Sequence, residues 1–220
     1  MTTKHEYAAA RRAERRARRL AEYRRGLRPF AVAAWEISKE HNVGTLVRTA
    51  HAAAAAEVIL TGEREWNVEA ARTAENYTEI VQLPAEPGTL LRHVRERGYQ
   101  LVAVELAEGS TSLFDAVYPE RPCFLLGAEL GGLPDDLLDA AALIVQIPQW
   151  GLVPCLNLAV AGSIVIYDYL GKRHTAGRLD RPEGGLVSTD ETDTMVGRPG
   201  ASGTPAGERG HTGLEPDAEQ

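Results

Sequence analysis

The chain has 220 residues, of which 44% are hydrophobic and 25% charged, which is typical of a globular protein with one ordinary domain and some additional sequence. No stretch approaches the roughly 18 consecutive apolar residues that a membrane span requires, and no signal peptide opens the chain, so we expect a cytoplasmic protein with no membrane partner. The two cysteines, Cys123 and Cys155, cannot form a disulfide framework. No group of Cys and His residues has zinc-site spacing, and we expect no metal ion.

Basic residues concentrate near the N-terminus, although the net charge of the chain is −7. Residues 1–28 carry nine arginines and Lys4 against three glutamates, whereas residues 29–174 and residues 175–220 are both acidic. A basic arm on an acidic body predicts a polyanionic partner that contacts the arm.

The basic arm, residues 1–28, is predicted to form a helix, because alanine and arginine are strong helix formers and Glu14 stands four residues before Arg18. Four apolar residues share one stripe of this helix: Ala13, Ala17, Leu20 and Leu27. In one interpretation the stripe packs against the body and the arginines are only solvated. The favoured interpretation is RNA contact, because surface helices seldom contain so few acids. It assigns RNA binding to six arginines: Arg11, Arg12, Arg15, Arg16, Arg18 and Arg19.

Residues 30–174 alternate short apolar runs with helical patterns. The predicted strands are Phe30–Trp35, Val58–Leu60, Glu79–Leu83, Gln100–Val104, Pro122–Leu126 and Leu143–Ile147. The predicted helices are Gly44–Ala56, Val68–Asn76, Gly88–Arg97, Pro134–Ala141 and Leu156–Leu170. Continuous apolar strands separated by helices indicate an α/β fold, with a mostly parallel sheet and helices on both faces.

The composition changes after the last predicted helix. Residues 175–220 are rich in Gly, Pro, Thr, Asp and Glu and contain no aromatic residue. Such a segment cannot bury enough apolar surface to offset its ordering entropy, so we predict a disordered acidic tail. The expected organisation is therefore an arm, a domain over residues 29–174, and this tail.

Three segments of the domain combine glycine with polar residues near predicted strand ends. In His41–Ala50, Asn42 is interpreted as a helix cap, Gly44 allows close backbone approach, and Arg48 lies one turn further. The second segment is Phe124–Pro134, whose glycine-rich loop contains Glu129; Pro134 is expected to start a helix at its favoured first position. The third segment is Ile147–Gly162, in which Asn157 lies in the first turn of a helix. A glycine-rich loop after a parallel strand indicates a ligand at the carboxyl edge of the sheet.

In their order and spacing the three segments resemble the SpoU/TrmH family of the SPOUT methyltransferases, which methylate RNA ribose 2'-hydroxyl groups. The family segments N-x-G-x-x-x-R-T-A, G-[SA]-E-x-x-G-[LI] and I-P-x-x-G-x-x-x-S-L-N correspond here to residues 42–50, 127–133 and 147–157. The resemblance covers roughly residues 30–172.

The resemblance implies a C-terminal deep trefoil knot, S-adenosylmethionine as cofactor, and a homodimer with RNA crossing the subunit interface. By matched position, it implies a catalytic group of Arg48, Asn42, Glu129 and Asn157. It implies cofactor contacts from Leu126, Gly127, Gly132, Ile147, Gln149 and Leu156.

Two positions near the motifs, Cys155 and His51, differ from the family pattern. Cys155 replaces the serine that precedes Leu-Asn in the family, and a thiol is a weak donor, which puts a contact by that serine in doubt. The favoured interpretation of Cys155 is a small buried core residue. The glycine common after R-T-A is missing, and His51–Ala56 is expected to continue as plain helix. His51 is interpreted as a packed or solvated histidine rather than as a proton acceptor.

The chemistry leaves two roles open for Arg48. The family position is that of a general base, but an arginine side chain holds its proton tightly. The alternative is a clamp on the 3'-side phosphate that stabilises the developing alkoxide, while the phosphate or a water takes the proton. Asn42 and Glu129 would then orient Arg48 and the ribose.

Transfer RNA is the favoured substrate, because 28 residues are too few for the folded N-terminal RNA-binding domain that ribosomal RNA enzymes of the family often carry. The alternatives are a ribosomal RNA 2'-O-methyltransferase, a SPOUT-like dimer that binds RNA or assists ribosome assembly without catalysis, and a small-molecule methyltransferase. The basic arm argues against the last.

Overall fold

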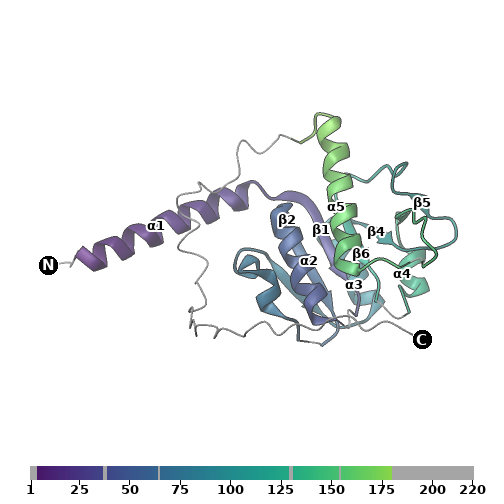
Figure 1. The fold of residues 1–220 in the computed structure, drawn as a ribbon, viewed down its shortest axis with the longest axis horizontal. Coiled ribbons are helices and arrows are strands. Elements are labelled where there is room, and N and C mark those ends of the chain that lie inside the picture. The colour runs from purple at the N-terminus through teal and green to yellow at the C-terminus, as the bar shows by residue number, and fades with distance from the viewer. Residues whose placement is uncertain (1–3, 37–38, 64, 129–130, 154, 180–220) are drawn as a thin grey trace, which may run out of the picture. The chain divides into compact units, whose positions relative to one another are not determined.

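The computed structural model describes residues 4–36, 39–63, 65–128, 131–153 and 155–179. These residues form seven strands, and every strand pairing is parallel, in the order β3-β2-β1-β6-β4-β7-β5 (Figure 1). The strands are β1 (Arg28–Ala34), β2 (Ala55–Thr61), β3 (Ile80–Leu83), β4 (Gln100–Val104), β5 (Thr111–Ser112), β6 (Pro122–Leu126) and β7 (Leu143–Gln146). The predicted parallel α/β sheet is confirmed.

The middle of the sheet is buried on both faces. In β1, Val32 lies opposite Val58 of β2 and Phe124 of β6. Every residue of Phe30–Trp35 and of Pro122–Leu126 is buried. This burial explains why the strand sequences are continuously apolar rather than alternating.

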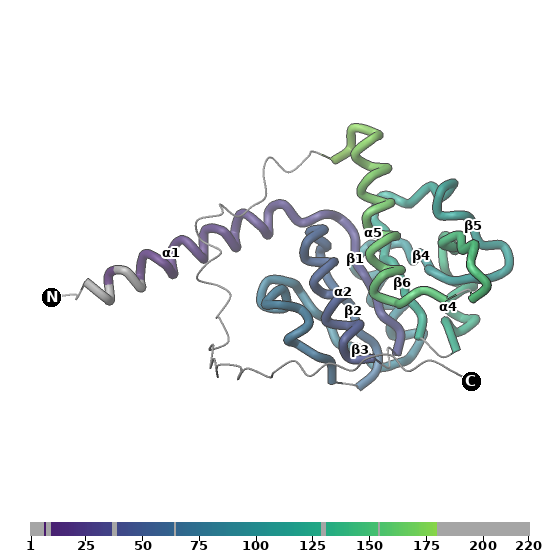
Figure 2. The backbone as a smooth tube through the Cα atoms, in the orientation of Figure 1, coloured from purple at the N-terminus to yellow at the C-terminus, as the bar shows by residue number. Residues whose placement is uncertain are grey.

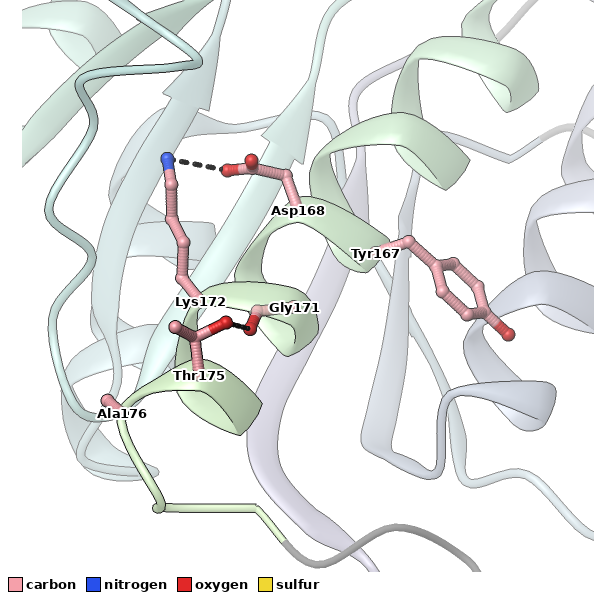
Figure 3. A pocket seen from close by; sticks show the side chains of 6 residues that line it. All are labelled: Tyr167, Asp168, Gly171, Lys172, Thr175 and Ala176. Atoms are coloured by element: carbon pink, nitrogen blue, oxygen red, sulfur yellow. Dashed lines mark hydrogen bonds and ion pairs between the residues drawn. The ribbon is translucent and has the colours of Figure 1, made fainter.

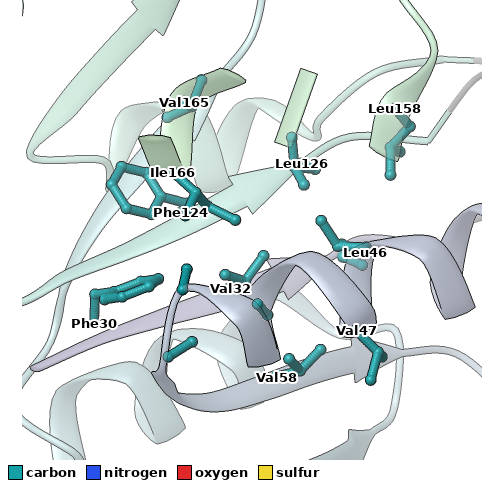
Figure 4. Close-up of a cluster of buried hydrophobic side chains, with 14 of the residues drawn as sticks. Phe30, Val32, Leu46, Val47, Val58, Phe124, Leu126, Leu158, Val165 and Ile166 are labelled. Atoms are coloured by element: carbon teal, nitrogen blue, oxygen red, sulfur yellow. The ribbon is translucent and has the colours of Figure 1, made fainter. Parts of the chain in front are cut away.

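Helices cover both faces, as the sequence predicts. Helices α2 (Glu40–Ala52) and α5 (Leu158–Thr175) pack on one face, around a cluster that includes Phe30, Leu46 and Phe124 (Figures 1 and 4). Helices α3 (Pro87–Glu96) and α4 (Asp135–Asp139) pack on the other face through Leu90 and Leu137. Full burial of each such side chain stabilises the fold by about 1.5–3 kcal/mol.

Two glycines allow α2 to approach its neighbours closely. A Cβ atom on Gly44 would lie 2.4 Å from the Asn67 carbonyl oxygen, beside the 3₁₀ helix η1 (Val68–Ala71). A Cβ atom on Gly162 of α5 would lie 2.6 Å from Leu46 of α2. The predicted close approach at Gly44 is therefore confirmed.

Two element predictions near α2 are wrong in detail, and one short strand elsewhere in the sheet is missed. Helix α2 ends at Ala52 instead of Ala56, because Ala54 takes a positive φ of 56° and the chain enters β2 at Ala55. The helix predicted over Val68–Asn76 is two 3₁₀ turns, η1 and η2 (Ala74–Asn76), interrupted where Arg72 and Thr73 adopt left-handed conformations. The two-residue strand β5 carries no recognisable sequence pattern and was not predicted.

The N-terminal arm forms the predicted helix, α1 (Lys4–Arg25) (Figure 2). The alanines of its apolar stripe, Ala13 and Ala17, are exposed and do not pack against the body, whereas Leu20 and Leu27 are half-buried. Arg18 pairs with Glu22 at 3.1 Å rather than with Glu14. The end of the helix is instead attached through Tyr23, whose ring lies 4.6 Å from that of His51 and whose hydroxyl donates to the His51 carbonyl.

The segment between β4 and β6, residues 105–121, is called the crossing segment here. It carries β5 to the far side of β7 and then returns to the middle of the sheet. Its Tyr118 hydroxyl donates to Asp168 of α5 at 2.8 Å, and Asp168 also pairs with Lys172 at 2.8 Å. Lys172 donates in turn to the carbonyls of Leu113 and Ala116. Helix α5 is thus hydrogen-bonded to the crossing segment along its C-terminal half.

Beyond α5 the described chain continues to Leu179, and Arg178 pairs with Glu120 at 2.5 Å. Residues 180–220 lie outside the described residues, so the predicted disorder of the tail stays a prediction. Within the described part of the chain, no helix has the length and apolar character needed to cross a bilayer.

Candidate functional site: the carboxyl edge of the sheet

The first motif forms the beginning of α2, which follows β1 at the carboxyl edge of the sheet. The helix is preceded by Lys39 as its N-cap residue, so the prediction of Asn42 as the cap is wrong. Asn42 lies inside the first turn and is 6% exposed. A buried amide requires hydrogen-bond partners, and one partner comes from the third motif.

That partner is Asn157, which joins the first and third motifs. Its Nδ2 donates to Asn42 Oδ1 at 3.0 Å. Its Oδ1 accepts from the backbone N–H groups of Ala159 and Val160, so Asn157 is the N-cap of α5 rather than a first-turn residue. One amide thereby fixes the N-termini of α2 and α5 against each other.

Arg48 lies apart from this pair. It is exposed on α2, six residues and therefore about 9 Å along the helix axis from Asn42. No hydrogen bond or ion pair connects it with another of the described residues. Of the predicted catalytic group, only Asn42 and Asn157 are in contact among the described residues. The exposed Arg48 guanidinium is available for an external anion. Glu129, the fourth member, lies outside the described residues.

The second motif makes a tight glycine turn after β6. Strand β6 ends at Leu126, whose carbonyl accepts from Trp35 N–H at 2.9 Å, and an antiparallel bridge joins Ala128 to Gly132. Gly132 has a φ of 65°, and a Cβ atom on Gly127 would lie 2.9 Å from the carbonyl carbon of Gly132. Side chains at either position would fill the turn, which explains both glycines. The helix predicted to start at Pro134 begins one residue later, with Pro134 at the N-cap position.

One residue at this edge was not predicted. Glu105 follows β4 directly, and its Oε2 lies 3.1 Å from the position a Gly127 Cβ would take and 2.9 Å from that of Gly132. Its Oε1 accepts from the backbone N–H of Leu106 at 3.0 Å. The signal in the sequence is an acidic residue at the end of a buried parallel strand, beside the glycine-rich loop in space but not in sequence.

The third motif leaves β7 as a projecting loop. Ile147 packs against the core and Gln149 is half-buried, whereas Trp150, Leu152 and Leu156 are exposed. Cys155 is exposed as well, so its interpretation as a buried core residue is wrong. The physical reason is that this loop lies beyond the end of the sheet, where no described element covers it.

His51 is packed, as predicted. Its ring lies between those of Tyr23 and Tyr77, and its Nδ1 is 3.3 Å from the Thr78 hydroxyl. Burial lowers its pKa below the ordinary value. These contacts hold His51 in the attachment of α1 to the body.

The six arginines predicted to bind RNA are all exposed along α1. One of them, Arg16, has its guanidinium 5.6 Å from the centre of the Tyr77 ring. The arm therefore presents a basic surface that begins beside the body and extends away from it along the helix.

An open groove on α5 lies away from the motifs. It is lined by Tyr167, Asp168, Gly171, Lys172, Thr175 and Ala176 (Figure 3). These residues lie in the C-terminal half of α5 and at its C-cap, Ala176, whereas Asn157 precedes the first residue of the helix. The groove is therefore separate from the motif residues.

Known proteins match this chain over the same region. The profile of the SpoU rRNA Methylase family matches residues 29–167. The tRNA (guanosine(18)-2'-O)-methyltransferase of Escherichia coli K12 is 27% identical over 158 residues, or 71% of this chain and 69% of the relative. The protein of the same name from Thermus thermophilus is 28% identical over 174 residues, or 78% of this chain and 90% of the relative.

Solved structures agree with these matches. The TrmH/SpoU tRNA modifying enzyme of A. aeolicus superposes with a TM-score of 0.68 at 25% identity, over 81% of this chain and 91% of that one. The AdoMet-bound rRNA methyltransferase from Sinorhizobium meliloti superposes with a TM-score of 0.59 at 32% identity, over 68% of this chain and 59% of that one. Because the family profile spans more than half of the sequence, the chain belongs to the SpoU rRNA Methylase family.

Proposed function

We propose that this protein transfers the methyl group of S-adenosylmethionine to a ribose 2'-hydroxyl of transfer RNA. The observation that carries the proposal is the hydrogen bond from Asn157 to Asn42, which joins the first and third motifs at the carboxyl edge, where the glycine turn of the second motif also lies. The names of the E. coli and T. thermophilus relatives favour transfer RNA over ribosomal RNA. A transfer RNA substrate is also compatible with the expected cytoplasmic location.

The glycine turn fits the cofactor. A Cβ atom on Gly127 would come within 2.9 Å of the Gly132 carbonyl carbon, and one on Gly132 within 2.9 Å of Glu105 Oε2. Glycine at both positions therefore keeps the backbone beside the ends of β4 and β6 free of side chains, so that a ligand can approach it closely. We assign the cofactor contacts to Leu126, Gly127, Gly132, Ile147, Gln149 and Leu156, and the S. meliloti relative is a structure with AdoMet bound. When bound, S-adenosylmethionine supplies a methyl group on a positively charged sulfonium.

The chain's own residues then bind and orient the RNA. The exposed Arg48 guanidinium grips a phosphate next to the target ribose and stabilises the oxygen as its proton leaves to the phosphate or to water. Asn157 and Asn42 hold the two helix N-termini in place, and Glu129 is assigned to orient Arg48 or the ribose. Methyl transfer leaves S-adenosylhomocysteine and a 2'-O-methyl ribose.

A homodimer is part of the proposal. Large apolar side chains are exposed on the third-motif loop and on α5, including Trp150 (84% exposed), Val153 (75%), Val160 (48%) and Tyr167 (54%). Trp150 stacks on Phe114, which is itself 64% exposed, so the pair adds to the exposed apolar surface. Large exposed apolar surfaces mark interaction sites. Light scattering should give a dimer for the wild type and a monomer for Val160→Asp. Val68→Asp, at an equally exposed position on η1, is the control that should stay dimeric.

The trefoil knot is also proposed. After β7 the chain returns as α5, which lies against the sheet and is hydrogen-bonded to the crossing segment through Tyr118 and Lys172. The crossing segment starts at β4 and ends at β6, inside the sheet, and it carries β5 beyond β7. It therefore forms a loop around β7, and in the proposed knot the chain from β7 to α5 passes through this loop.

The substrate class is tested by incubating the protein with labelled S-adenosylmethionine and either unmodified transfer RNA or unmodified ribosomal RNA. We expect label in transfer RNA only. Label in ribosomal RNA alone would support the alternative substrate. RNA binding without any label would support a non-catalytic SPOUT-like dimer.

A further inference from the structure

The carboxylate of Glu105 occupies an unusual position for an acidic side chain. It projects from the carboxyl end of β4 onto the glycine turn, and it stands 2.9 Å from where a Gly132 Cβ would lie. Gly132 and Gly127 are two of the residues assigned to the cofactor. The glycine turn is therefore contacted by one half-buried carboxylate.

No structural role within the described residues accounts for this carboxylate. Its Oε1 accepts from the N–H of the next residue, Leu106, but no ion pair joins Glu105 to a described Lys, Arg or His side chain. Its Oε2 lies against the backbone of the glycine turn without a hydrogen-bond donor among the described residues. Oε2 is not a buried oxygen without a partner, so it remains accessible to a ligand that supplies hydrogen-bond donors.

The chemistry of the group restricts what it can bind. An ionised carboxylate only accepts hydrogen bonds, and its two oxygens match two adjacent hydroxyl donors. Acidic side chains at the ends of parallel strands bind ribose hydroxyls in this way in dinucleotide sites. The adenosine ribose of S-adenosylmethionine offers such a pair of hydroxyls.

We propose that Glu105 is a further cofactor-binding residue, whose carboxylate accepts hydrogen bonds from the ribose hydroxyls of S-adenosylmethionine. This inference rests on the proposed function, because it assumes that the glycine turn holds that cofactor. It adds a side-chain contact to a site otherwise assigned to backbone groups and apolar residues.

The test is calorimetric binding of S-adenosylhomocysteine and of its analogue without the ribose 3'-hydroxyl. The proteins are the wild type, Glu105→Ala, the isosteric Glu105→Gln, and Glu108→Ala as a control. Glu108 is an exposed acid in the same segment, so its removal makes the same change in net charge. A melting curve of each variant identifies any loss of folding.

We expect Glu105→Ala and Glu105→Gln to bind S-adenosylhomocysteine about ten-fold or more weakly than the wild type, because a charge-assisted hydrogen bond is lost. The wild type should discriminate against the deoxy analogue, Glu105→Ala should bind both ligands alike, and Glu108→Ala should behave as the wild type. Wild-type binding that is unchanged in Glu105→Ala, or discrimination that persists in it, would overturn this inference alone. No binding by the wild type would overturn the proposed function as well.

Discussion

Asn157 performs two structural roles with one amide group. Its oxygen caps α5, and its nitrogen reaches Asn42, a residue 115 positions earlier in the chain. Each hydrogen bond of this kind contributes only about 1 kcal/mol, yet the pair fixes two helix N-termini at the same edge of the sheet. Residues at this edge therefore hold their positions because of contacts between motifs.

Replacing Arg48 with Ala should abolish most methyl transfer while cofactor affinity stays within a few-fold of the wild type. Arg48 is exposed and lies outside the proposed cofactor contacts. Loss of a charge-assisted hydrogen bond to the developing alkoxide or its phosphate should cost about 3–4 kcal/mol, or a factor of 10² to 10³ in rate. Single-turnover methylation with saturating RNA measures this rate separately from RNA binding.

Two further variants sharpen that measurement. Arg48→Lys should restore little activity, because an ammonium cannot reproduce the planar two-pronged grip of a guanidinium. Arg95→Ala removes an exposed arginine from α3, on the other face of the sheet, and should leave the rate unchanged. Near-normal turnover in Arg48→Ala would refute the assigned role, and a selective loss of cofactor binding would move Arg48 to the cofactor pocket.

Local sequence reasoning succeeds at some residues and fails at others for physical reasons. Gly44 and His51 are interpreted correctly, because close approach and packing follow from residue type. Asn42 is assigned as a cap from its preference alone, and its true partner, Asn157, is too distant in sequence to be recognised. Glu105 is missed for the same reason, since only the fold brings β4 beside the glycine turn.

At the scale of elements, α2 is held by close contacts with η1 and α5. Gly44→Ala should lower the free energy of unfolding by about 1–3 kcal/mol, because a Cβ atom there would meet Asn67 and Ala70 at 2.4 and 2.6 Å. Urea denaturation measures the change. Gly88→Ala in α3 is the matched control, since no atom lies within 4 Å of its Cβ position, and it should be neutral or stabilising by up to about 1 kcal/mol.

The attachment of the crossing segment to α5 predicts sensitivity to alkaline pH. Burial and the hydrogen bond to Asp168 raise the pKa of Tyr118 above its ordinary value, and burial raises the pKa of Tyr23 to about 12. The folded state therefore keeps protons that unfolded tyrosines release near pH 10. This stabilisation is fully present below pH 10 and is lost as the pH rises above it, because the unfolded state then binds fewer protons.

Urea denaturation of the wild type and of Tyr118→Phe between pH 8 and pH 11.5 measures this effect. The free energy of unfolding of the wild type should fall above pH 10, and the fall should be shallower in Tyr118→Phe. At neutral pH the variant should lose about 1 kcal/mol, the value of a typical hydrogen bond. A wild-type stability that does not change up to pH 11.5 would contradict the assigned role of the tyrosines.

Element boundaries illustrate what sequence patterns cannot give. Residues 50–56 are nearly all alanine, which favours helix, yet α2 ends at Ala52 because the chain must turn into β2. Strand β5 has two residues and exists only because β7 provides a pairing edge. At the end of α2, tertiary structure overrides a local preference for helix; at β5, it forms a strand where the sequence shows no local preference.

For the whole molecule, the separation of a basic arm from an acidic body predicts how RNA binding depends on salt. Deleting residues 1–19 removes the six exposed arginines but keeps Tyr23, which attaches the helix to His51. RNA binding should weaken, and the log–log salt slope should decrease by roughly one for each phosphate that the arm no longer neutralises. Cofactor affinity should not change.

Filter binding across a series of salt concentrations gives this slope. Deletion of residues 180–220 is the control and should alter neither the slope nor the melting temperature. An unchanged slope after deletion of residues 1–19 would mean that the arm is only a solvated helix.

The parallel sheet with helices on both faces is predictable, because continuous apolar strands alternate with helical patterns. The family is predictable from the order of three motifs, which the profile match over residues 29–167 confirms. The proposed knot is not derivable from composition or periodicity, because the route of a backbone leaves no trace in local hydrophobic patterns.

Mapping the methylated atom distinguishes methyl transfer to a ribose oxygen of transfer RNA from methylation of a base. Transfer RNA methylated with labelled S-adenosylmethionine is hydrolysed with alkali, which cannot cleave the linkage after a 2'-O-methylated ribose. We expect all label to appear in alkali-resistant dinucleotides from one position, and we expect almost none with Arg48→Ala. Label recovered in mononucleotides would place the methyl group on a base and refute ribose 2'-O-methylation by this protein.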